Sequence, residues 1–300
     1  MKNRRVPFER PWLLTAVIAG MICAAILINS FGRTSSNSLL CSLSGAYTRP
    51  GHSDDSVAQT QLIAILHYAT SRVVPQQSLA EIRVSFDVLQ SLAPCNFLVY
   101  GLGHDSVMWS SFNPKGTTIF LEEDPKWVQT VLKQAPNLLA HTVRYRTHLS
   151  EADQLLGSYK SEPACLPPDV RLRDNTACRL ALTGLPQEVY DTEWDLIMID
   201  APRGYFPEAP GRMGAIFTAA VMARARKRQG VTHVFLHDVN RRIEKVYAEE
   251  FLCKKNLVKA VGRLWHFAIP STANDTMTSA LLLKMFLTKS STFLFLFFLI

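Results

Sequence analysis

The chain has 300 residues, of which 48% are hydrophobic and 19% are charged, and its formal net charge is +7. This composition lies outside the range of disordered proteins, and the length suits one large domain. The positive charge favours an acidic partner such as nucleic acid, anionic lipid or a uronic-acid polymer. Part of it precedes the first apolar run, so the domain itself is less basic and we do not expect it to bind nucleic acid.

An uncharged apolar run occupies residues 11–28. As a helix it would span about 27 Å, close to the thickness of a thin secretory-pathway bilayer. Basic residues precede it and polar residues follow it, which places residues 1–10 in the cytoplasm and the rest in the lumen. We expect a single-pass type II signal anchor followed by a lumenal stem at residues 29–58. A cleaved signal peptide and a buried core helix are the alternatives.

The chain has six cysteines, one of them inside the apolar run. A lumenal domain permits disulfides. Cys165 and Cys178 flank a proline-rich polar loop that a bridge would restrict, so we predict this disulfide, with Cys95 and Cys253 as a weaker second pair. Metal binding is the rival explanation, and the lack of a Cys-x-x-Cys spacing argues against zinc.

A glycine turn follows the first predicted strand of the domain. The apolar run at residues 96–100 leads into this turn and then into a predicted helix at 106–112. Glycines let the backbone turn tightly and approach a ligand, while the start of a helix offers unpaired N–H groups. We expect the turn to bind a cofactor through Gly101, Gly103, His104 and Asp105.

A second predicted strand, residues 117–121, ends at Glu122. A carboxylate at this position can accept both ribose hydroxyls of an adenosine cofactor, although a solvated acidic loop is the alternative. Asp124 then caps a predicted helix at 125–135, with Pro125 as its first residue. The turn lacks the third glycine of the dinucleotide fingerprint, and no phosphate-binding GKS or GKT sequence follows. A nucleoside without pyrophosphate fits better, so S-adenosylmethionine is favoured over NAD.

Two further predicted strands end in polar side chains. Residues 194–200 read as a central parallel strand ending at Asp200, and residues 231–236 precede His237 and Asp238. In open α/β sheets, ligands bind beyond the carboxyl ends of the strands. Methyl transfer to a sugar hydroxyl requires loss of the hydroxyl proton. Either Asp200, His237 or Asp238 acts as general base, or a divalent cation lowers the pKa of the hydroxyl.

Asp200, Asp238 and Asn240 are similar to the two aspartates and one asparagine that bind magnesium in catechol-type O-methyltransferases, although Val239 here separates the second aspartate from the asparagine. These three residues are therefore the candidate metal ligands. For His237 and Asp200, a purely structural role is the alternative.

A loop rich in aromatic and arginine residues, 205–213, opens a predicted helix at 214–227. Guanidinium groups pair well with carboxylates, which suits a carboxylated sugar. Residues 258–270 read as a closing strand or hairpin, in which Arg263, Trp265 and His266 are weaker candidates. The candidates for binding a uronate are Arg203, Tyr205, Arg212, Arg241 and Arg242.

Residues 101–109, 117–128, 193–213 and 232–253 resemble the plant polysaccharide-biosynthesis family once labelled domain of unknown function 579. The resemblance covers about residues 60 to 272. It implies an α/β domain at 59–272 with the fold of a Rossmann-like methyltransferase sandwich and a mostly parallel sheet, preceded by one transmembrane helix. It also carries over a cofactor site at Gly101, Gly103, Glu122 and Asp200.

That family includes glucuronoxylan 4-O-methyltransferases and the irregular-xylem proteins needed for normal xylan. Segments at 10–20, 146–156 and 232–242 resemble the irregular-xylem branch more closely. The resemblance implies an S-adenosylmethionine-dependent enzyme of the Golgi membrane that methylates glucuronic acid side chains of glucuronoxylan for the secondary cell wall. A non-catalytic organiser of the xylan-synthesis proteins is the alternative. An atypical apolar tail follows at 273–300, and its residues 277–300 have no recognised counterpart in the family.

Overall fold

The computed structural model describes residues 52–168 and 170–272. The predicted anchor at 11–28, most of the predicted stem at 29–58 and the tail at 273–300 lie outside this range. Within it, every helix is too short or too polar to cross a membrane. The predicted membrane topology therefore stays a prediction.

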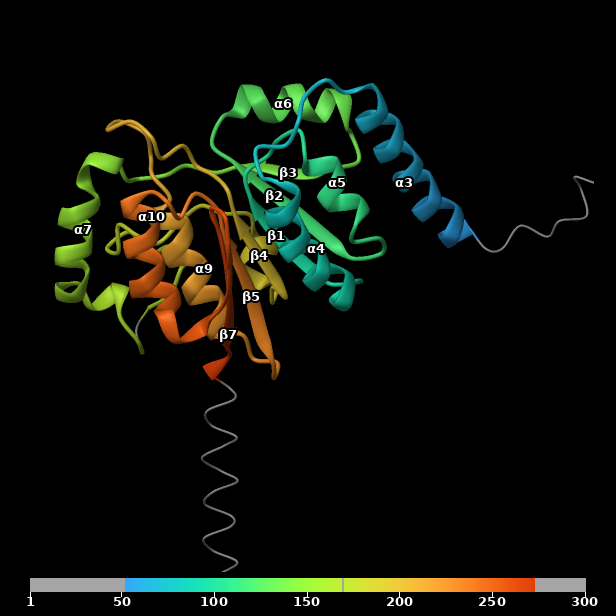
Figure 1. Cartoon of the computed structure of the whole chain (residues 1–300). Coiled ribbons are helices and arrows are strands. Elements are labelled where there is room, and N and C mark those ends of the chain that lie inside the picture. The colour runs from blue at the N-terminus through green and yellow to red at the C-terminus, as the bar shows by residue number, and fades with distance from the viewer. Residues whose placement is uncertain (1–51, 169, 273–300) are drawn as a thin grey trace, which may run out of the picture. The chain divides into compact units, whose positions relative to one another are not determined.

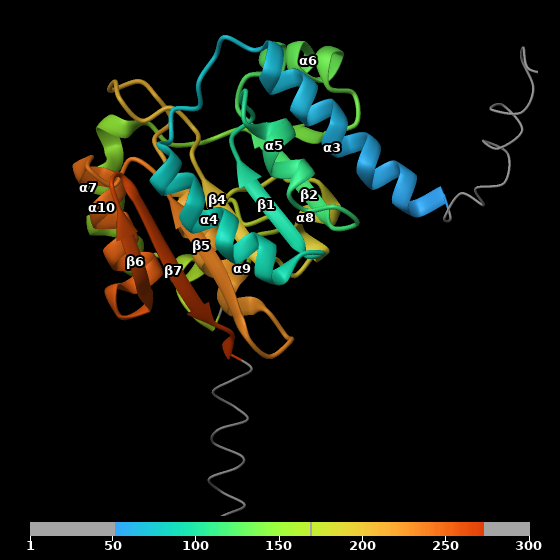
Figure 2. The same ribbon diagram turned by 45° about the vertical axis from the view of Figure 1, so that its right-hand side comes forward.

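The centre of the domain is a seven-stranded sheet with the order β3-β2-β1-β4-β5-β7-β6 (Figures 1 and 2). The five strands from β3 to β5 are parallel, and β7 is antiparallel to both of its neighbours. The predicted mostly parallel α/β sheet is thus confirmed. The strands are β1 (Asn96–Tyr100), β2 (Thr117–Glu122), β3 (Leu139–Thr142), β4 (Leu196–Ile199), β5 (Val231–Leu236), β6 (Leu257–Val261) and β7 (Leu264–Pro270).

The strand β3 was not predicted. It is a short edge strand in which the end residues Leu139 and Thr142 are exposed, so it lacks the apolar run that marks the central strands. The predicted closing hairpin is confirmed as β6 and β7, which reverse direction at Gly262 with a φ of 54°. Local patterns therefore found the buried strands and missed the exposed one.

Helices cover both faces of the sheet. In chain order they are α3 (His52–Thr70), α4 (Leu79–Leu92), α5 (Ser106–Ser111), α6 (Pro125–Gln134), α7 (Ala152–Ser158), α8 (Gln187–Asp191), α9 (Met213–Ala225) and α10 (Arg242–Tyr247). The helices predicted at 106–112, 125–135 and 214–227 are present as α5, α6 and α9.

Alternating residues along each central strand face two separate hydrophobic cores. In β1, Phe97 and Val99 pack into the core closed by α4, α5 and α6, whereas Leu98 and Tyr100 pack into the core closed by α7, α9 and α10. Because both faces are covered, the strands are apolar throughout rather than alternating in polarity. Polar side chains are displaced to the strand ends, where the candidate site lies.

Two features fix segments around this framework. Ser78 and Glu81 form a capping box that begins α4. Cys165 and Cys178 form a disulfide with an S–S distance of 2.00 Å, which closes the loop predicted to need it. The prediction of a second disulfide between Cys95 and Cys253 is wrong, because both thiols are free.

Candidate active site

The site begins at the glycine turn after β1. Gly101 has a φ of 125°, a conformation that side-chain-bearing residues rarely adopt. A Cβ atom added there would lie 3.3 Å from the Cβ of Ala201, because the turn packs directly against the end of β4. Glycine is therefore required at this position by both conformation and space.

A cavity of about 410 Å³ opens over this turn. One wall is the strap, defined here as residues 71–78, which connects α3 to α4. The structure brings every residue predicted to bind the cofactor to the lining of this one cavity: Gly101, Gly103, His104, Asp105, Glu122 and Asp200. The strap residues that join them were not predicted.

Glu122, at the end of β2, is held by the backbone. Its Oε2 accepts a hydrogen bond from the N–H of Leu102 at 3.1 Å, and its Oε1 accepts from the N–H groups of Glu123 and Asp124 at 2.9 and 3.1 Å. A carboxylate offers about four lone-pair positions, so one remains for a ligand hydroxyl. The sequence predicted that this carboxylate accepts both ribose hydroxyls. The structure leaves room for one such hydrogen bond rather than two.

Asp105 and Asp200 both line the first cavity. The Oδ2 of Asp105 accepts a hydrogen bond from the indole N–H of Trp109 at 2.8 Å. Burial raises the pKa of Asp105, and the charge of nearby Asp200 raises it further. Two carboxylates that disfavour each other's ionisation would both be stabilised by a cationic ligand between them. A sulfonium or ammonium group has the required charge.

A second cavity of about 340 Å³ adjoins the first. Five residues line both cavities: Gln76, Glu122, Trp127, Asp200 and Ala201. The second cavity adds a basic and aromatic wall from the loops after β4 and β5. Asp200 therefore stands where two ligands, one in each cavity, could meet.

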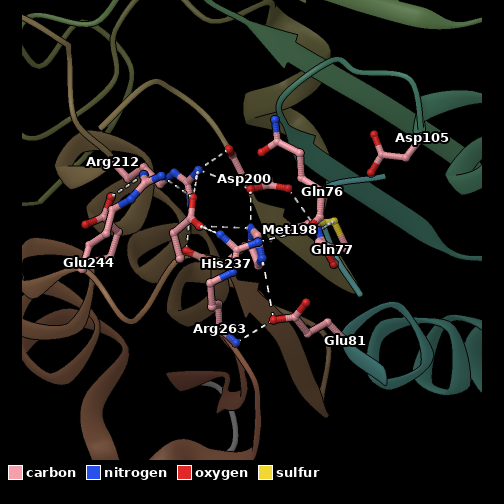
Figure 3. Close-up of polar contacts among 12 residues, drawn as sticks. Gln76, Gln77, Glu81, Asp105, Met198, Asp200, Arg212, His237, Glu244 and Arg263 are labelled. Carbon is pink, nitrogen blue, oxygen red and sulfur yellow. Dashed lines mark hydrogen bonds and ion pairs between the residues drawn. The ribbon is translucent and has the colours of Figure 1, made fainter. Parts of the chain in front are cut away.

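Asp200 is held from three sides (Figure 3). Its Oδ1 lies 2.9 Å from the Nδ1 of His237 and 3.2 Å from a guanidinium nitrogen of Arg212, while its Oδ2 accepts a hydrogen bond from Gln77 at 3.1 Å. Burial alone would raise the pKa of Asp200, but the His237 hydrogen bond and the Arg212 charge together lower it below its ordinary value. Asp200 is consequently an ionised carboxylate and a weak base.

The expectation that His237 acts as a base on the substrate is not supported. Its side chain has 0% exposure and lines neither cavity, and its Nε2 lies 3.8 Å from Glu81 Oε1 on the side away from Asp200. Asp238 borders the second cavity, but its side chain is only 4% exposed and is held by ion pairs. Both residues therefore position other groups.

Arg212 borders the second cavity, but its side chain is only 5% exposed. Its guanidinium donates to the backbone carbonyls of Pro202, His237 and Asp200, and to the carboxylates of Asp200 and Asp238. These contacts direct most of its donors into the protein, and uronate binding by Arg212 stays a prediction. Arg212 instead ties the ends of β4 and β5 together.

Arg242 lies away from the site. It forms an ion pair with Asp153 at 2.6 Å on the surface and lines neither cavity. Of the residues predicted to bind a uronate, four line the second cavity: Arg203, Tyr205, Arg212 and Arg241. The guanidinium of Arg241 lies 5.9 Å from the centroid of the Tyr205 ring. Arg203, Tyr205 and Arg241 are the more exposed of these residues, and their role in uronate binding stays a prediction.

The donor set was tested as a metal site. Asp200, His237 and Asp238 can each offer one ligand atom within 4.8 Å of the others. However, the Asp238 carboxylate already contacts three guanidinium groups, those of Arg212, Arg241 and Arg263, at 2.9 to 3.0 Å. A divalent cation would meet these positive charges at contact distance.

The third predicted ligand, Asn240, is exposed, and no contact recorded for residues 52–168 and 170–272 joins its side chain to either aspartate. The arrangement therefore does not fit the predicted metal site. No chemical step is assigned to a metal.

Gln77 and Glu81 were missed from the sequence, whereas Arg263 was a weaker candidate in the predicted closing hairpin. Gln77 contacts Asp200, Glu81 accepts a hydrogen bond from the N–H of Arg263 at 2.6 Å, and Arg263 pairs with Asp238 at 2.9 Å (Figure 3). The Ser-x-x-Glu spacing of the capping box was the one local signal that could have drawn attention to Glu81. The strap and the β6–β7 turn meet the strand ends only in the folded chain.

Comparison with known proteins identifies the family. The family model described as IRX15/IRX15L/GXM matches residues 80–267. Arabinogalactan O-methyltransferase 1 of Arabidopsis thaliana is 60% identical over 282 residues, which cover 92% of this chain and 98% of that protein. Glucuronoxylan 4-O-methyltransferase 1 of the same species is 52% identical over 208 residues, covering 69% of this chain and 73% of that protein.

Protein IRREGULAR XYLEM 15 of Arabidopsis thaliana is 39% identical over 222 residues, which cover 72% of this chain and 68% of that protein. Short segments of the sequence predicted a closer resemblance to the irregular-xylem branch. This prediction is wrong, because the two O-methyltransferases are more similar to this chain in sequence identity. The expected enzyme class, an S-adenosylmethionine-dependent O-methyltransferase, is confirmed. The chain belongs to the IRX15/IRX15L/GXM family.

Proposed function

We propose that this enzyme methylates a hydroxyl group of a uronic acid residue in a plant arabinogalactan. The observation that carries the proposal is the pair of adjoining cavities that share Asp200. The acceptor class is supported by 60% identity to an arabinogalactan O-methyltransferase over nearly the whole chain. The basic wall of the second cavity suits a carboxylated sugar. Glucuronoxylan, the acceptor expected from the sequence, is the second candidate, supported by 52% identity.

The first cavity is the proposed cofactor site. S-adenosylmethionine, when bound, supplies a methyl group on a positively charged sulfur for in-line attack by a hydroxyl oxygen. Glu122 can accept a ribose hydroxyl, and the backbone around Gly101 allows close approach of the ligand. Asp105 and Asp200 supply negative charge to a cationic ligand. These roles follow from lone pairs, space and charge already present in the chain.

Asp200 also faces the second cavity, where it can accept a hydrogen bond from the acceptor hydroxyl. A lowered pKa makes Asp200 a poor base for an ordinary sugar hydroxyl. The carboxylate can nevertheless take the proton once the bond between the acceptor oxygen and the methyl carbon has begun to form. At that stage the oxygen resembles that of a protonated ether, which is a very strong acid. Asp200 therefore orients the hydroxyl first and receives its proton late.

Arg203, Tyr205 and Arg241 form the proposed acceptor wall. The side chain of Arg203 is 52% exposed and pairs with Glu123 at 3.2 Å, while that of Arg241 is 29% exposed and pairs with Asp238 at 3.0 Å. A sugar carboxylate can add to these half-open guanidinium groups, and the exposed Tyr205 ring offers a flat surface to a pyranose. The wall recognises charge and shape together.

We further propose that the enzyme works in the Golgi lumen, held by residues 11–28 as a type II anchor. The support is the uncharged run with basic residues on its N-terminal side. An association with other polysaccharide-synthesis proteins stays a prediction.

The deciding experiment is a labelled-methyl assay with the full chain. Arabinogalactan, carboxyl-reduced arabinogalactan and glucuronoxylan would be compared as acceptors. We expect transfer to arabinogalactan, a loss of at least about tenfold after carboxyl reduction, and a loss of about a hundredfold in Asp200→Asn. Binding of S-adenosylmethionine without transfer to any acceptor would contradict the proposal and favour the organiser. Preferred transfer to glucuronoxylan would show that glucuronoxylan, rather than arabinogalactan, is the acceptor.

A further inference from the structure

An open cavity of about 460 Å³ adjoins the second cavity of the active site, and it is called the flank cavity here. Three residues line both cavities: Glu123, Asp124 and Arg203. Because the two cavities share this wall, a ligand in the second cavity can continue into the flank cavity without crossing the protein. The cofactor and the reacting sugar are assigned to the first two cavities, so the flank cavity is available to a further part of the acceptor.

Segments that are distant in sequence build the rest of the flank cavity. Pro125 begins α6, Arg144 and Tyr145 follow β3, and Pro210 belongs to the loop between β4 and α9. The helix α6 and the strand β3 lie side by side (Figure 1). Two proline rings and a half-buried tyrosine supply apolar surface beside the charged groups. Such a wall suits the apolar C–H face of a pyranose ring.

The charges that line the flank cavity balance each other. Arg144 and Arg203 are the cations, and Glu123 and Asp124 are the anions. Arg203 pairs with Glu123 at 3.2 Å and with Asp124 at 3.7 Å. An uncharged ligand with several hydroxyl groups fits this set, because a hydroxyl can donate to a carboxylate and accept from a guanidinium. A second uronate would instead bring a negative charge close to two carboxylates, so the lining favours a neutral sugar.

Arg144 is the cation of this lining that is free to bind a ligand. Its side chain is exposed, and its guanidinium forms no hydrogen bond or ion pair within residues 52–168 and 170–272. Arg146, two residues later, in contrast donates to four backbone carbonyls and so holds its loop together. Replacing Arg144 should therefore leave the fold intact while it removes donors that face the flank cavity.

We propose that the flank cavity binds the neutral sugar to which the uronate of the acceptor is attached. This inference rests on the proposed function, which places the uronate in the second cavity. Arg144 donates to hydroxyl groups of the neutral sugar, while Pro125 and Pro210 contact its ring. The enzyme therefore recognises at least a disaccharide, and a uronic acid without that neighbour is a poor acceptor.

Two acceptors that differ by one sugar test this inference in a labelled-methyl assay of the full chain. One is methyl glucuronoside, and the other is a disaccharide of glucuronic acid linked to galactose. We expect the disaccharide to have a KM about tenfold lower, the value of one hydrogen bond from a charged donor. Arg144→Ala should raise the KM of the disaccharide several-fold more than that of methyl glucuronoside.

Arg171→Ala is the matched control. Arg171 is also exposed and without a side-chain partner in the described part of the chain, but it lines neither the second cavity nor the flank cavity. This variant should keep the full preference for the disaccharide. Equal KM values for the two acceptors in the unmodified chain would overturn the proposal. So would an equal change for both acceptors in Arg144→Ala.

Direct binding separates this inference from the proposed function. Calorimetric titration of each acceptor into the full chain saturated with S-adenosylhomocysteine, the demethylated cofactor, requires no methyl transfer. Tighter binding of the disaccharide that is lost in Arg144→Ala would support the flank cavity even if neither acceptor were methylated, and only the proposed reaction would then fail. Equal binding of the two acceptors, or no measurable binding of the disaccharide, would refute the assignment of the flank cavity.

Discussion

The Nδ1 of His237 lies 2.9 Å from the Oδ1 of Asp200, although no part of the His237 side chain reaches solvent. In the proposed mechanism the histidine therefore acts through the aspartate. Its other nitrogen has no hydrogen-bond partner in the described part of the chain and faces Glu81 at 3.8 Å. This places an ionised carboxylate at the cavity wall with a buried imidazole behind it.

Removing the His237 donor should impair catalysis through Asp200. We expect His237→Ala to lower kcat roughly tenfold, because the carboxylate loses one of the contacts that orient it. His237→Asn can keep a donor near the Nδ1 position and should recover much of that loss. Without the donor, the pKa of Asp200 rises, so the acid limb of the pH–rate profile should move to higher pH in His237→Ala. Equal losses in both variants with an unchanged profile would indicate a structural role alone.

Adjacent arginines provide a matched test of acceptor binding. Arg241 lines the second cavity, whereas Arg242 pairs with Asp153 outside it. We expect Arg241→Gln to raise the KM for a uronate-bearing acceptor about tenfold, the value of one charge-assisted hydrogen bond. Arg242→Gln should leave it unchanged. The acceptor wall would be misassigned if Arg242→Gln had the larger effect.

The glycine turn predicts a contrast between two alanine substitutions. Gly101→Ala would force a side chain into a positive φ beside Ala201 and should lower the free energy of unfolding by about 2 kcal/mol, with loss of cofactor affinity. Gly157→Ala, in α7, meets no atom within 4 Å and should stabilise the protein by up to about 1 kcal/mol. Urea denaturation and calorimetric titration with S-adenosylmethionine would measure both. Wild-type affinity in Gly101→Ala would show that the turn is not the binding surface.

A buried histidine pair predicts how stability depends on pH. The Nε2 of His266 lies 2.9 Å from the Nδ1 of His233, and burial lowers the pKa of His266 from 6.5 to about 4. Between these values the unfolded chain binds a proton that the folded chain does not, so stability is lost as the pH falls. The free energy of unfolding falls by at most about 3 kcal/mol. Urea denaturation at pH 7 and pH 5 should show a smaller difference in His266→Gln than in the unmodified protein.

Several features of the site could be predicted because their causes are local. The buried strands appear as apolar runs, and residues that directly follow parallel strands meet at one edge of the sheet. For this reason Gly101, Glu122 and Asp200 were expected near one another, and the structure places all three around the same cavity. The disulfide loop between Cys165 and Cys178 is another local feature.

The tertiary structure alone decided which polar side chains face the ligands. His237 points inward because Glu81 and Asp200 surround it, and Arg212 is enclosed because its acceptors come from two different strand ends. No spacing along the chain encodes these contacts, since a long or ring-bearing side chain takes its direction from partners remote in sequence. The sequence by itself determined which strand ends carry the chemistry. Packing between distant segments left the side chains of Asp200 and Arg241 25% and 29% exposed at the second cavity, and it enclosed those of His237 and Arg212, at 0% and 5%.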